Sequence, residues 1–455
     1  MDEFVLGLDV GTTSISVVPV LADGTVLPGK SCEHGAGLKP ERPWESLQDV
    51  ATLLGTAEEL LEETKNELGS PNAIGVCSQM HGVVYLDDAG KPVSPLYTWL
   101  DGRGNLPIGC SSDGGRDDRE AVQPSYAAHL SQLTGSSLSS GFGAYDIAAS
   151  DWNRERIRAA RVPVALLPEI APSGTILGAW SASPGTRVTT CIGDNQASVL
   201  GAAENFRQDG ILSLGTSGQI SVHLHETASP HPAIEIRPFP APGYLGVGAS
   251  LTGGKAYQIL RDFYTDVCAR FAGEPPTRID YEELTELAAA VLQSLVDEGR
   301  SVIDDPDLPR VDTRFLGTRA TPDARASIRN LTPWNFDVGH LTLALLSGMI
   351  DELHQLFDVL PEDVRAQTRR LCLTGNALRR NPVLRHLAES HFSLPVYLSG
   401  YTEEAAVGAA LVAGVGSGLW SSYEEASRAV VANDRKTYPG VQSRNGRASE
   451  DSTKS

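Results

Sequence analysis

Two short turns rich in glycine and hydroxyl side chains are the first segments that could do chemistry. Gly11-Thr12-Thr13 follows an apolar run that ends at Asp9, and Gly215-Thr216-Ser217 follows a second apolar run. Glycine lets the backbone turn tightly, and successive N–H groups in such a turn can bind an anion. A carboxylate such as that of Asp9 can hold Mg²⁺, directly or through water. Either turn alone could be an ordinary hairpin, but the two together favour a site that grips the phosphates of one nucleotide.

A second carboxylate lies at a predicted strand-to-helix junction. Asp194 follows the apolar run Val188 to Ile192 and precedes a predicted helix that begins near Ala197. A carboxylate at such a junction can accept the proton of an attacking hydroxyl. Aspartate is also a favoured helix N-cap, and this segment alone leaves that structural alternative open.

Three further polar clusters each have a functional and a structural interpretation. Ser78-Gln79-Met80-His81-Gly82 could present polar groups to a polyol, or could be a buried turn with a satisfied histidine. Trp99-Leu100-Asp101-Gly102-Arg103 could stack on a sugar and hydrogen-bond it, or could be a surface salt bridge beside a core tryptophan. Gly375-Asn376-Ala377-Leu378-Arg379-Arg380-Asn381 could open a helix whose N-terminus suits a nucleotide, or could be a common helix cap.

Composition excludes several classes of function. A length of 455 residues predicts two large domains, and a formal net charge of −20 argues against nucleic acid and anionic lipid as partners. The six cysteines form no CxxC pair, so neither a zinc site nor a disulfide framework is indicated. His386 and His391 are expected to lack further ligands and to be structural. The acidic start and the absence of a long apolar run predict a cytoplasmic protein without a signal peptide or membrane span.

Apolar periodicity predicts the elements that must position these residues. The predicted strands are Phe4–Asp9, Ile15–Val20, Ala73–Cys77, Val83–Leu86, Ile211–Leu214, Gln219–Leu224 and Leu371–Thr374. The predicted helices are 46–68, 126–133, 256–272, 281–298, 337–360 and an Ala/Gly-rich helix over 403–417 that can pack close to a neighbour. DVGTTSISV and SLGTSGQISV can be aligned with each other, which indicates an internal duplication.

Eight segments in order resemble the FGGY carbohydrate kinases over residues 4–415. They are GLDVGTTS, SQMHG, TWLDGR, GDNQAS, LSLGTSGQ, SLTGG, LTGNALRRN and EEAAVGAAL. CSQMHGVVY, YLGVGASLTGG, VGHLTLAL and LTGNALRRNPVL are most similar to the sedoheptulokinase subgroup of that family.

The resemblance implies an α/β fold of two actin-like, ribonuclease H-like ATPase domains around a deep cleft. The first, 1–203, would bind the sugar and the second, 204–435, would bind ATP, while 436–455 would be a disordered tail. The implied reaction is ATP- and Mg²⁺-dependent phosphorylation of a ketose primary hydroxyl, foremost that of sedoheptulose. Two alternatives stay open. The chain could be a kinase for another sugar such as xylulose, or a catalytically silent protein that binds a sugar or a nucleotide.

The resemblance also assigns roles to residues. Asp194 corresponds to the catalytic base, and Asp9 to the magnesium-associated carboxylate. The residues that correspond to phosphate contacts are Gly11, Thr12, Thr13, Gly215, Thr216 and Ser217. Sugar contacts fall to Gln79, Met80, His81, Trp99, Asp101, Arg103 and Asn195. Nucleotide contacts fall to Gly253, Gly254, Gly375, Asn376 and Asn381.

One region departs from the family pattern. Residues 104–124 form a polar loop rich in Gly, Asp and Ser where the family carries a longer segment with a helix, and the shortened region extends to 146. Because this region lies on the expected sugar side, it leaves the identity of the ketose open. A shortened first domain could also expose an apolar face, so a homodimer is a further expectation.

Overall fold

The computed structural model describes residues 3–106, 145–159, 162–226, 231–272, 279–319 and 321–431. The predicted helix over 126–133, most of the polar loop 104–124 and the predicted tail lie outside the described residues. No helix in the described ranges is both long enough and apolar enough to cross a bilayer.

The first sheet has the strand order β3-β2-β1-β5-β10-β9, with β11 paired to β5. Its strands are β1 Phe4–Val10, β2 Ser14–Leu21, β3 Lys30–Glu33, β5 Ala73–Ser78, β9 Ile176–Trp180, β10 Ser183–Thr189 and β11 Ile192–Gly193. β1 and β2 form an antiparallel hairpin, and β5 then runs parallel to β1. The hairpin turn and the end of β5 therefore lie at the same edge of the sheet.

The second sheet repeats this plan with the order β14-β15-β13-β12-β18-β19. Its strands are β12 Asp209–Leu214, β13 Gly218–Leu224, β14 Ile234–Pro238, β15 Tyr244–Ser250, β18 Arg370–Thr374 and β19 Val396–Leu398. The hairpin of β12 and β13 is antiparallel, and β18 runs parallel to β12. The shared topology agrees with the duplication that the two Gly-Thr turns indicate.

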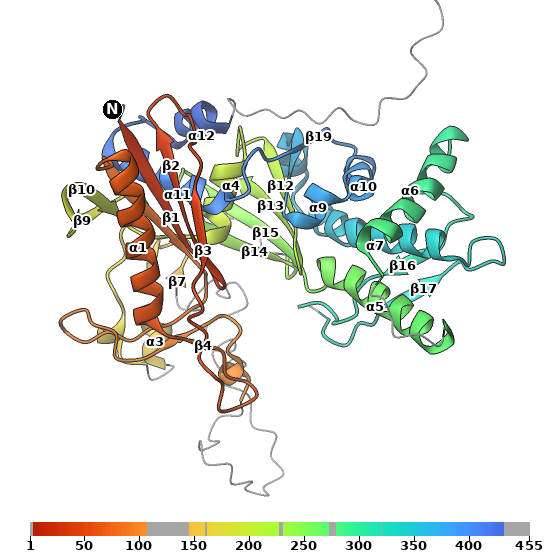
Figure 1. The fold of residues 1–455 in the computed structure, drawn as a ribbon, viewed down its shortest axis with the longest axis horizontal. Helices are drawn as coiled ribbons and strands as arrows, with labels where there is room; N and C mark the ends of the chain where they lie inside the picture. The colour runs from red at the N-terminus through yellow and green to blue at the C-terminus, as the bar shows by residue number, and fades with distance from the viewer. Residues whose placement is uncertain are drawn as a thin grey trace, which may run out of the picture.

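Helices form layers around and between the two sheets (Figure 1). They are α1 Val50–Leu68, α3 Arg154–Ala159, α4 Asp194–Ala202, α5 Gly253–Ala272, α6 Tyr281–Asp297, α7 Val338–Asp358, α8 Glu362–Gln367, α9 Asn376–Arg380, α10 Pro382–Phe392, α11 Glu404–Ser417 and α12 Tyr423–Val431. α1 covers one face of the first sheet, while α7 and α10 cover the far face of the second. α4 and α11 lie between the sheets, where one apolar core joins residues of both.

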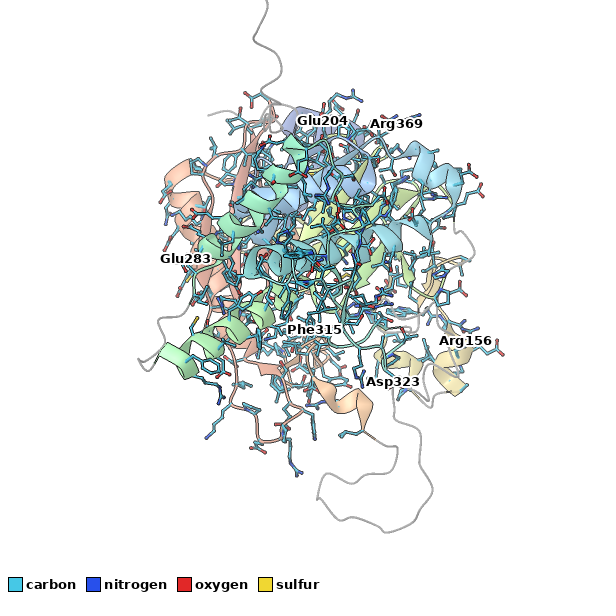
Figure 2. All side chains as sticks on the ribbon, turned by 90° about the vertical axis from the view of Figure 1, so that its right-hand side faces the viewer. Arg156, Glu204, Glu283, Phe315, Asp323 and Arg369 are labelled. Atoms are coloured by element: carbon cyan, nitrogen blue, oxygen red, sulfur yellow. The ribbon has the colours of Figure 1, made fainter. Side chains whose placement is uncertain are left out.

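Short elements complete the described chain. They are β4 Leu47–Gln48, β6 Leu96–Tyr97, β7 Tyr145–Asp146, β8 Asp151–Trp152, β16 Arg310–Asp312, β17 Ser327–Arg329 and two 3₁₀ turns, Gly102–Asn105 and Val164–Leu166. Figure 2 views the molecule from the side of the second sheet, where Glu283 of α6 and Asp323 of the β16–β17 connection are labelled.

The two middle helices cross with their backbones in close contact. A Cβ atom on Gly408 of α11 would collide with the carbonyl group of Ala197 in α4, and one on Gly201 of α4 would collide with that of Glu404. The prediction that the Ala/Gly-rich helix packs close to a neighbour is therefore confirmed.

The structure corrects two local predictions. Val83–Leu86 is not a strand, because it makes only isolated bridges to Tyr97 and Pro92 and Leu86 is exposed. The helix expected from residue 46 begins at Val50, since the Asp49 side chain accepts a hydrogen bond from the Thr52 N–H and caps the helix there.

Candidate active site

A cavity of about 360 Å³ lies between the two sheets. Six residues selected from the sequence line it: Met80, His81, Trp99, Asp194, Asn195 and Gly375. The remaining lining residues are Ser198, Val199, Ile211, Ser213, Gln219, Ser221, Arg237, Arg319, Thr374 and Glu404. Because these residues come from both halves of the chain, only the assembled fold creates this site.

Asp194 is the first residue of α4 and faces the cavity. Gly193 occupies the N-cap position and makes no side-chain cap, so the interpretation of Asp194 as a plain N-cap is wrong. Asp194 Oδ1 accepts a hydrogen bond of 2.7 Å from the N–H of Asn195. Burial raises the pKa of the Asp194 carboxyl, and Arg237 and His81 partly oppose that rise by favouring the charged form.

Asp9 lies at the end of β1 among other acidic groups. The Cys77 thiol donates to Asp9 Oδ1 over 3.2 Å. Burial, followed by repulsion from Asp194 and Glu403, raises the pKa of Asp9 to about 6. Glu403, just before α11, accepts a hydrogen bond of 2.7 Å from Ser16. Carboxylate oxygens are ligands that suit a hard divalent cation such as Mg²⁺.

Each Gly-Thr turn is closed by a hydrogen bond from the N–H of its glycine, to the third residue onward in the first turn and to the second residue onward in the second turn. The N–H of Gly11 donates to the carbonyl of Ser14, and that of Gly215 to the carbonyl of Ser217, each over 3.0 Å. In the second turn, Gly254 N–H also donates to the Gly215 carbonyl over 2.8 Å. A Cβ atom on Gly253 would collide with the Ser217 carbonyl. Gly253 and Gly254 thus let the start of α5 pack directly on the second turn.

Hydrogen bonds connect the first turn to the segments predicted to contact sugar. Trp99 Nε1 donates to Thr12 Oγ1 over 3.1 Å, and Thr12 Oγ1 lies 3.5 Å from Gln79 Oε1. Gln48 Nε2 donates to the Thr12 carbonyl over 2.7 Å, and Gln79 Nε2 donates to Gln48 Oε1 over 2.8 Å. Gln48, which sequence reasoning missed, therefore bridges the first turn and Gln79.

Asp101 and Arg103 lie close to Trp99 in the sequence but pair with each other outside the cavity. Arg103 forms a forked ion pair with Asp101, and its guanidinium lies 4.1 Å from the centre of the Tyr97 ring. Asp101 also accepts a hydrogen bond from the Ser46 N–H over 3.1 Å. Neither residue is among the described side chains that line the cavity. Trp99 itself is 54 % exposed, so it is not a core tryptophan.

Two of the residues expected to contact the nucleotide, Gly375 and Asn376, lie where β18 leads into α9, whereas Asn381 is buried. Gly375 has a φ of 86° between β18 and α9, where a side chain would be strained, and Asn376 begins α9. Asn381 is buried, accepts a hydrogen bond from the Leu384 N–H and donates to Thr285 over 3.1 Å. Its side chain thus caps α10 and ties it to α6, and a direct nucleotide contact by Asn381 stays a prediction.

Arg237 of β14 is the most prominent cavity residue that sequence reasoning missed. Its Nη2 donates to Glu235 over 2.6 Å, and its Nη1 donates to Asn195 Oδ1 over 3.2 Å. Asn195 in turn donates to Gln219 over 2.9 Å. Arg319 forms a second ion pair with Glu235. The cation therefore fixes Asn195 and lies close enough to Asp194 to favour its charged form.

Glu404 is a second missed residue and marks the start of α11. Arg379 Nη2 donates to Glu404 Oε1 over 2.6 Å, and burial raises the pKa of the Glu404 carboxyl. Arg379 also donates to the carbonyls of Ser399 and Tyr401. This pair holds α9 against the N-terminal end of α11 at the cavity wall.

Comparison with solved structures identifies the fold. The fold is similar to that of xylulose kinase from Rhodospirillum rubrum, with a TM-score of 0.74 and 24 % identity over 94 % of this chain and 92 % of that one. It is also similar to glycerol kinase from Plasmodium falciparum with ADP, with a TM-score of 0.72 and 18 % identity over the same shares. The predicted two-domain, actin-like α/β fold is thus confirmed.

The family follows from the sequence matches. Residues 4–112 match the N-terminal domain of the FGGY family of carbohydrate kinases, and residues 210–417 match its C-terminal domain. The chain belongs to this family. Sedoheptulokinases from Mus musculus and Homo sapiens are each 29 % identical to it over 90 % of this chain and 96 % of theirs. The chain is therefore an ATP-dependent carbohydrate kinase.

Proposed function

We propose that the chain transfers the γ-phosphoryl group of ATP to the primary hydroxyl of a ketose, with sedoheptulose as the preferred acceptor. The observation that carries this proposal is the position of Asp194, a partly buried carboxylate at a helix N-terminus that faces a polar cavity between two sheets. The similarity to sedoheptulokinases over most of both chains supports the choice of acceptor.

In this proposal Asp194 accepts the proton of the attacking hydroxyl. A bond forms between that oxygen and the γ-phosphorus, and the bond from the γ-phosphorus to the bridging oxygen breaks, which releases ADP. Arg237 favours the ionised form of Asp194 that can act as a base. The N–H groups of Gly11-Thr12-Thr13 and Gly215-Thr216-Ser217 would bind phosphate oxygens from two sides.

Asp9, with Glu403 close to it, would hold the metal ion. The raised pKa of Asp9 fits this role, because a bound cation would offset the cost of burying its charge and the smaller repulsion from Asp194 and Glu403. Mg²⁺ would neutralise phosphate charge during the transfer.

The sugar would lie against the first-domain wall of the cavity. The half-exposed Trp99 indole offers an apolar face for the C–H groups of a sugar ring or chain. His81 and Asn195 offer hydrogen-bonding groups beside Asp194. Gln79 would act from behind this wall by holding the Thr12 turn through Gln48.

The test is ADP release with Mg²⁺-ATP and a panel of acceptors. The panel contains sedoheptulose, xylulose, ribulose, fructose, glycerol and a control without acceptor. We expect sedoheptulose to give the highest kcat/KM. A higher value with xylulose or glycerol would reassign the acceptor, and ATP binding without stimulation by any acceptor would favour a silent binding protein.

The homodimer expected from the shortened 104–146 region is a further proposal. Light scattering at several protein concentrations checks it, since a dimer would give about twice the mass of one chain at concentrations above its Kd.

A further inference from the structure

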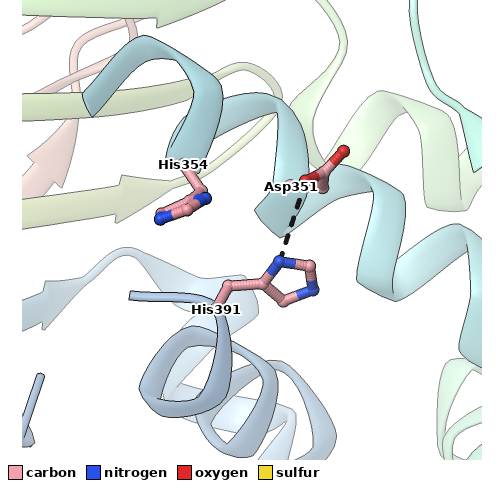
Figure 3. A group of neighbouring side chains, drawn as sticks. All are labelled: Asp351, His354 and His391. Carbon is pink, nitrogen blue, oxygen red and sulfur yellow. Dashed lines mark ion pairs between the residues drawn. The ribbon is translucent and has the colours of Figure 1, made fainter. Parts of the chain in front are cut away.

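A cluster of metal-ligating side chains lies in the second domain, outside the cavity that holds Asp194. The expectation that His391 lacks further ligands is wrong, because the fold brings it from α10 to Asp351 and His354 of α7 (Figure 3). We propose that Asp351, His354 and His391 bind a Zn²⁺ ion that links α7 to α10.

The separations of the ligand atoms fit one ion better than they fit direct hydrogen bonds. One ligand atom from each residue lies within 4.8 Å of the others. His391 Nδ1 and Asp351 Oδ1 are 3.8 Å apart, too far for a hydrogen bond. Two ligand atoms that each lie about 2.0–2.2 Å from one tetrahedral Zn²⁺ are roughly 3.4 Å apart. Small side-chain rotations would therefore complete the site.

The neighbouring residues hold the opposite ends of these ligands. His391 Nε2 is 2.9 Å from Ser347 Oγ, and Asp351 Oδ2 accepts a hydrogen bond of 2.8 Å from Gln355. These two bonds use Nε2 of His391 and Oδ2 of Asp351. The other two atoms, Nδ1 of His391 and Oδ1 of Asp351, therefore face each other. Metal-binding histidines and carboxylates are commonly oriented by such outer partners.

The third ligand is also held in place. The His354 ring packs edge-on against Phe392, with ring centres 5.0 Å apart, and its Nδ1 lies 3.6 Å from Asp358 Oδ2. Two imidazoles and one carboxylate form a donor set that suits Zn²⁺ rather than Mg²⁺.

Burial leaves one side of the site open. The His391 side chain is 4 % exposed, whereas those of His354 and Asp351 are 27 % and 48 % exposed. Asp351 and His391 also line a second cavity, of about 190 Å³. Three protein ligands with a fourth position reachable by water match the usual open zinc arrangement.

The test is a Zn²⁺ titration of the full chain after treatment with a chelator and dialysis. A chromophoric zinc chelator competes for the ion, and millimolar Mg²⁺ occupies carboxylate sites such as the one around Asp9. We expect one tight Zn²⁺ equivalent per chain. His354→Ala and Asp351→Asn, both at partly exposed positions, should each weaken binding by at least about tenfold.

The matched control is His340→Ala. His340 also lies on α7, is 28 % exposed, and pairs with Asp337 three residues earlier over 2.7 Å. It belongs to no group of three such ligands among the residues that the structure describes. His340→Ala should bind Zn²⁺ like the unmodified chain.

A second readout is thermal unfolding. One Zn²⁺ equivalent should raise the Tm of the unmodified chain and of His340→Ala, but not that of His354→Ala, because an ion that binds only the folded state stabilises it. Binding that is unchanged in both His354→Ala and Asp351→Asn, or the absence of a tight equivalent, would overturn the proposal.

Discussion

Partly buried carboxylates set the electrostatics of the site at the scale of single residues. Asp9 and Asp194 come from different strand ends, and each is disfavoured in its charged form mainly by burial. Asp194 has Arg237 near it to offset this cost, whereas for Asp9 the nearby carboxylates add to the cost. The two residues should therefore respond differently to pH and to substitution.

Asp9→Asn should stabilise the ligand-free protein at neutral pH. The pKa of Asp9 is raised from 3.8 to about 6, so the folded chain binds a proton more readily than the unfolded chain does. Ionised Asp9 therefore lowers stability above about pH 6, and this penalty disappears as the pH falls toward about 4. We expect the substitution to add up to about 3 kcal/mol to the free energy of unfolding at about pH 7.5. Urea denaturation at about pH 7.5 and pH 4.5 measures it, and an equal loss of stability at both pH values would refute it.

The charge of Arg237 should lower the pKa of Asp194, and its hydrogen bond should hold Asn195 in position. Arg237→Met removes the cation that favours ionised Asp194, so the acid limb of the pH profile of kcat/KM should move to higher pH. Arg237→Lys keeps the charge and should leave that limb in place. Both should lower kcat/KM for the sugar by about 10- to 100-fold, the range for a lost hydrogen bond to a charged group. Identical pH profiles for the two variants would contradict the assignment.

Residue types and order predict roles for Asp9, Asp194 and both Gly-Thr turns, and the structure places Asp194 at the cavity. They could not single out Arg237 or Glu404, because an arginine in a short strand and a glutamate at a helix start look the same whether exposed or buried. These two side chains reach the cavity only because β14 and α11 pack close to α4 in the folded chain.

At the scale of elements, the crossing of α4 and α11 connects the two sheets. The apolar core around these helices contains Val5 and Cys77 of the first sheet and Leu245 and Cys372 of the second. Asp194 begins α4 and Glu404 begins α11, so both helices start at the cavity. A change in the crossing would therefore move cavity residues as well.

Gly408→Ala should destabilise the fold, although alanine favours helices. The new Cβ would strike the Ala197 carbonyl, so the two helices would have to separate at a cost of about 1–3 kcal/mol. Gly55→Ala on α1 is the control, because no atom lies within 4 Å of the new Cβ and the change should stabilise the helix by about 0.5–1 kcal/mol. Denaturant unfolding of both variants measures the difference, and a stabilised Gly408→Ala protein would show that the crossing is looser than described.

The small residues of 403–417 were sufficient to predict close packing, but not to identify α4 as the partner. The strand predicted at Val83–Leu86 failed because an apolar run fits a loop as well as a strand when its backbone finds no continuous partner. Strand pairing depends on contacts between distant segments, which a local pattern does not contain.

At the scale of the whole molecule, each of the two sheets carries an antiparallel hairpin whose first strand has a parallel neighbour, and the cavity lies between the two sheets. The aligned Gly-Thr motifs predicted this duplication, and the strand pairing of the two sheets agrees with it. The sequence could not predict which residues line the cavity, because the lining depends on how α4 and α11 hold the two sheets together. Closure of the two halves around ATP and sugar would exclude water from the transfer.

The most direct test of the account is the turnover of Asp194→Ala with saturating Mg²⁺-ATP and the best acceptor of the panel. Calorimetric titration with ATP and circular dichroism would accompany the ADP-release assay. We expect a folded protein that binds ATP normally but has lost more than about a thousandfold in kcat, beyond a typical acid–base contribution. Turnover close to that of the unmodified chain would contradict the role of Asp194 as the base.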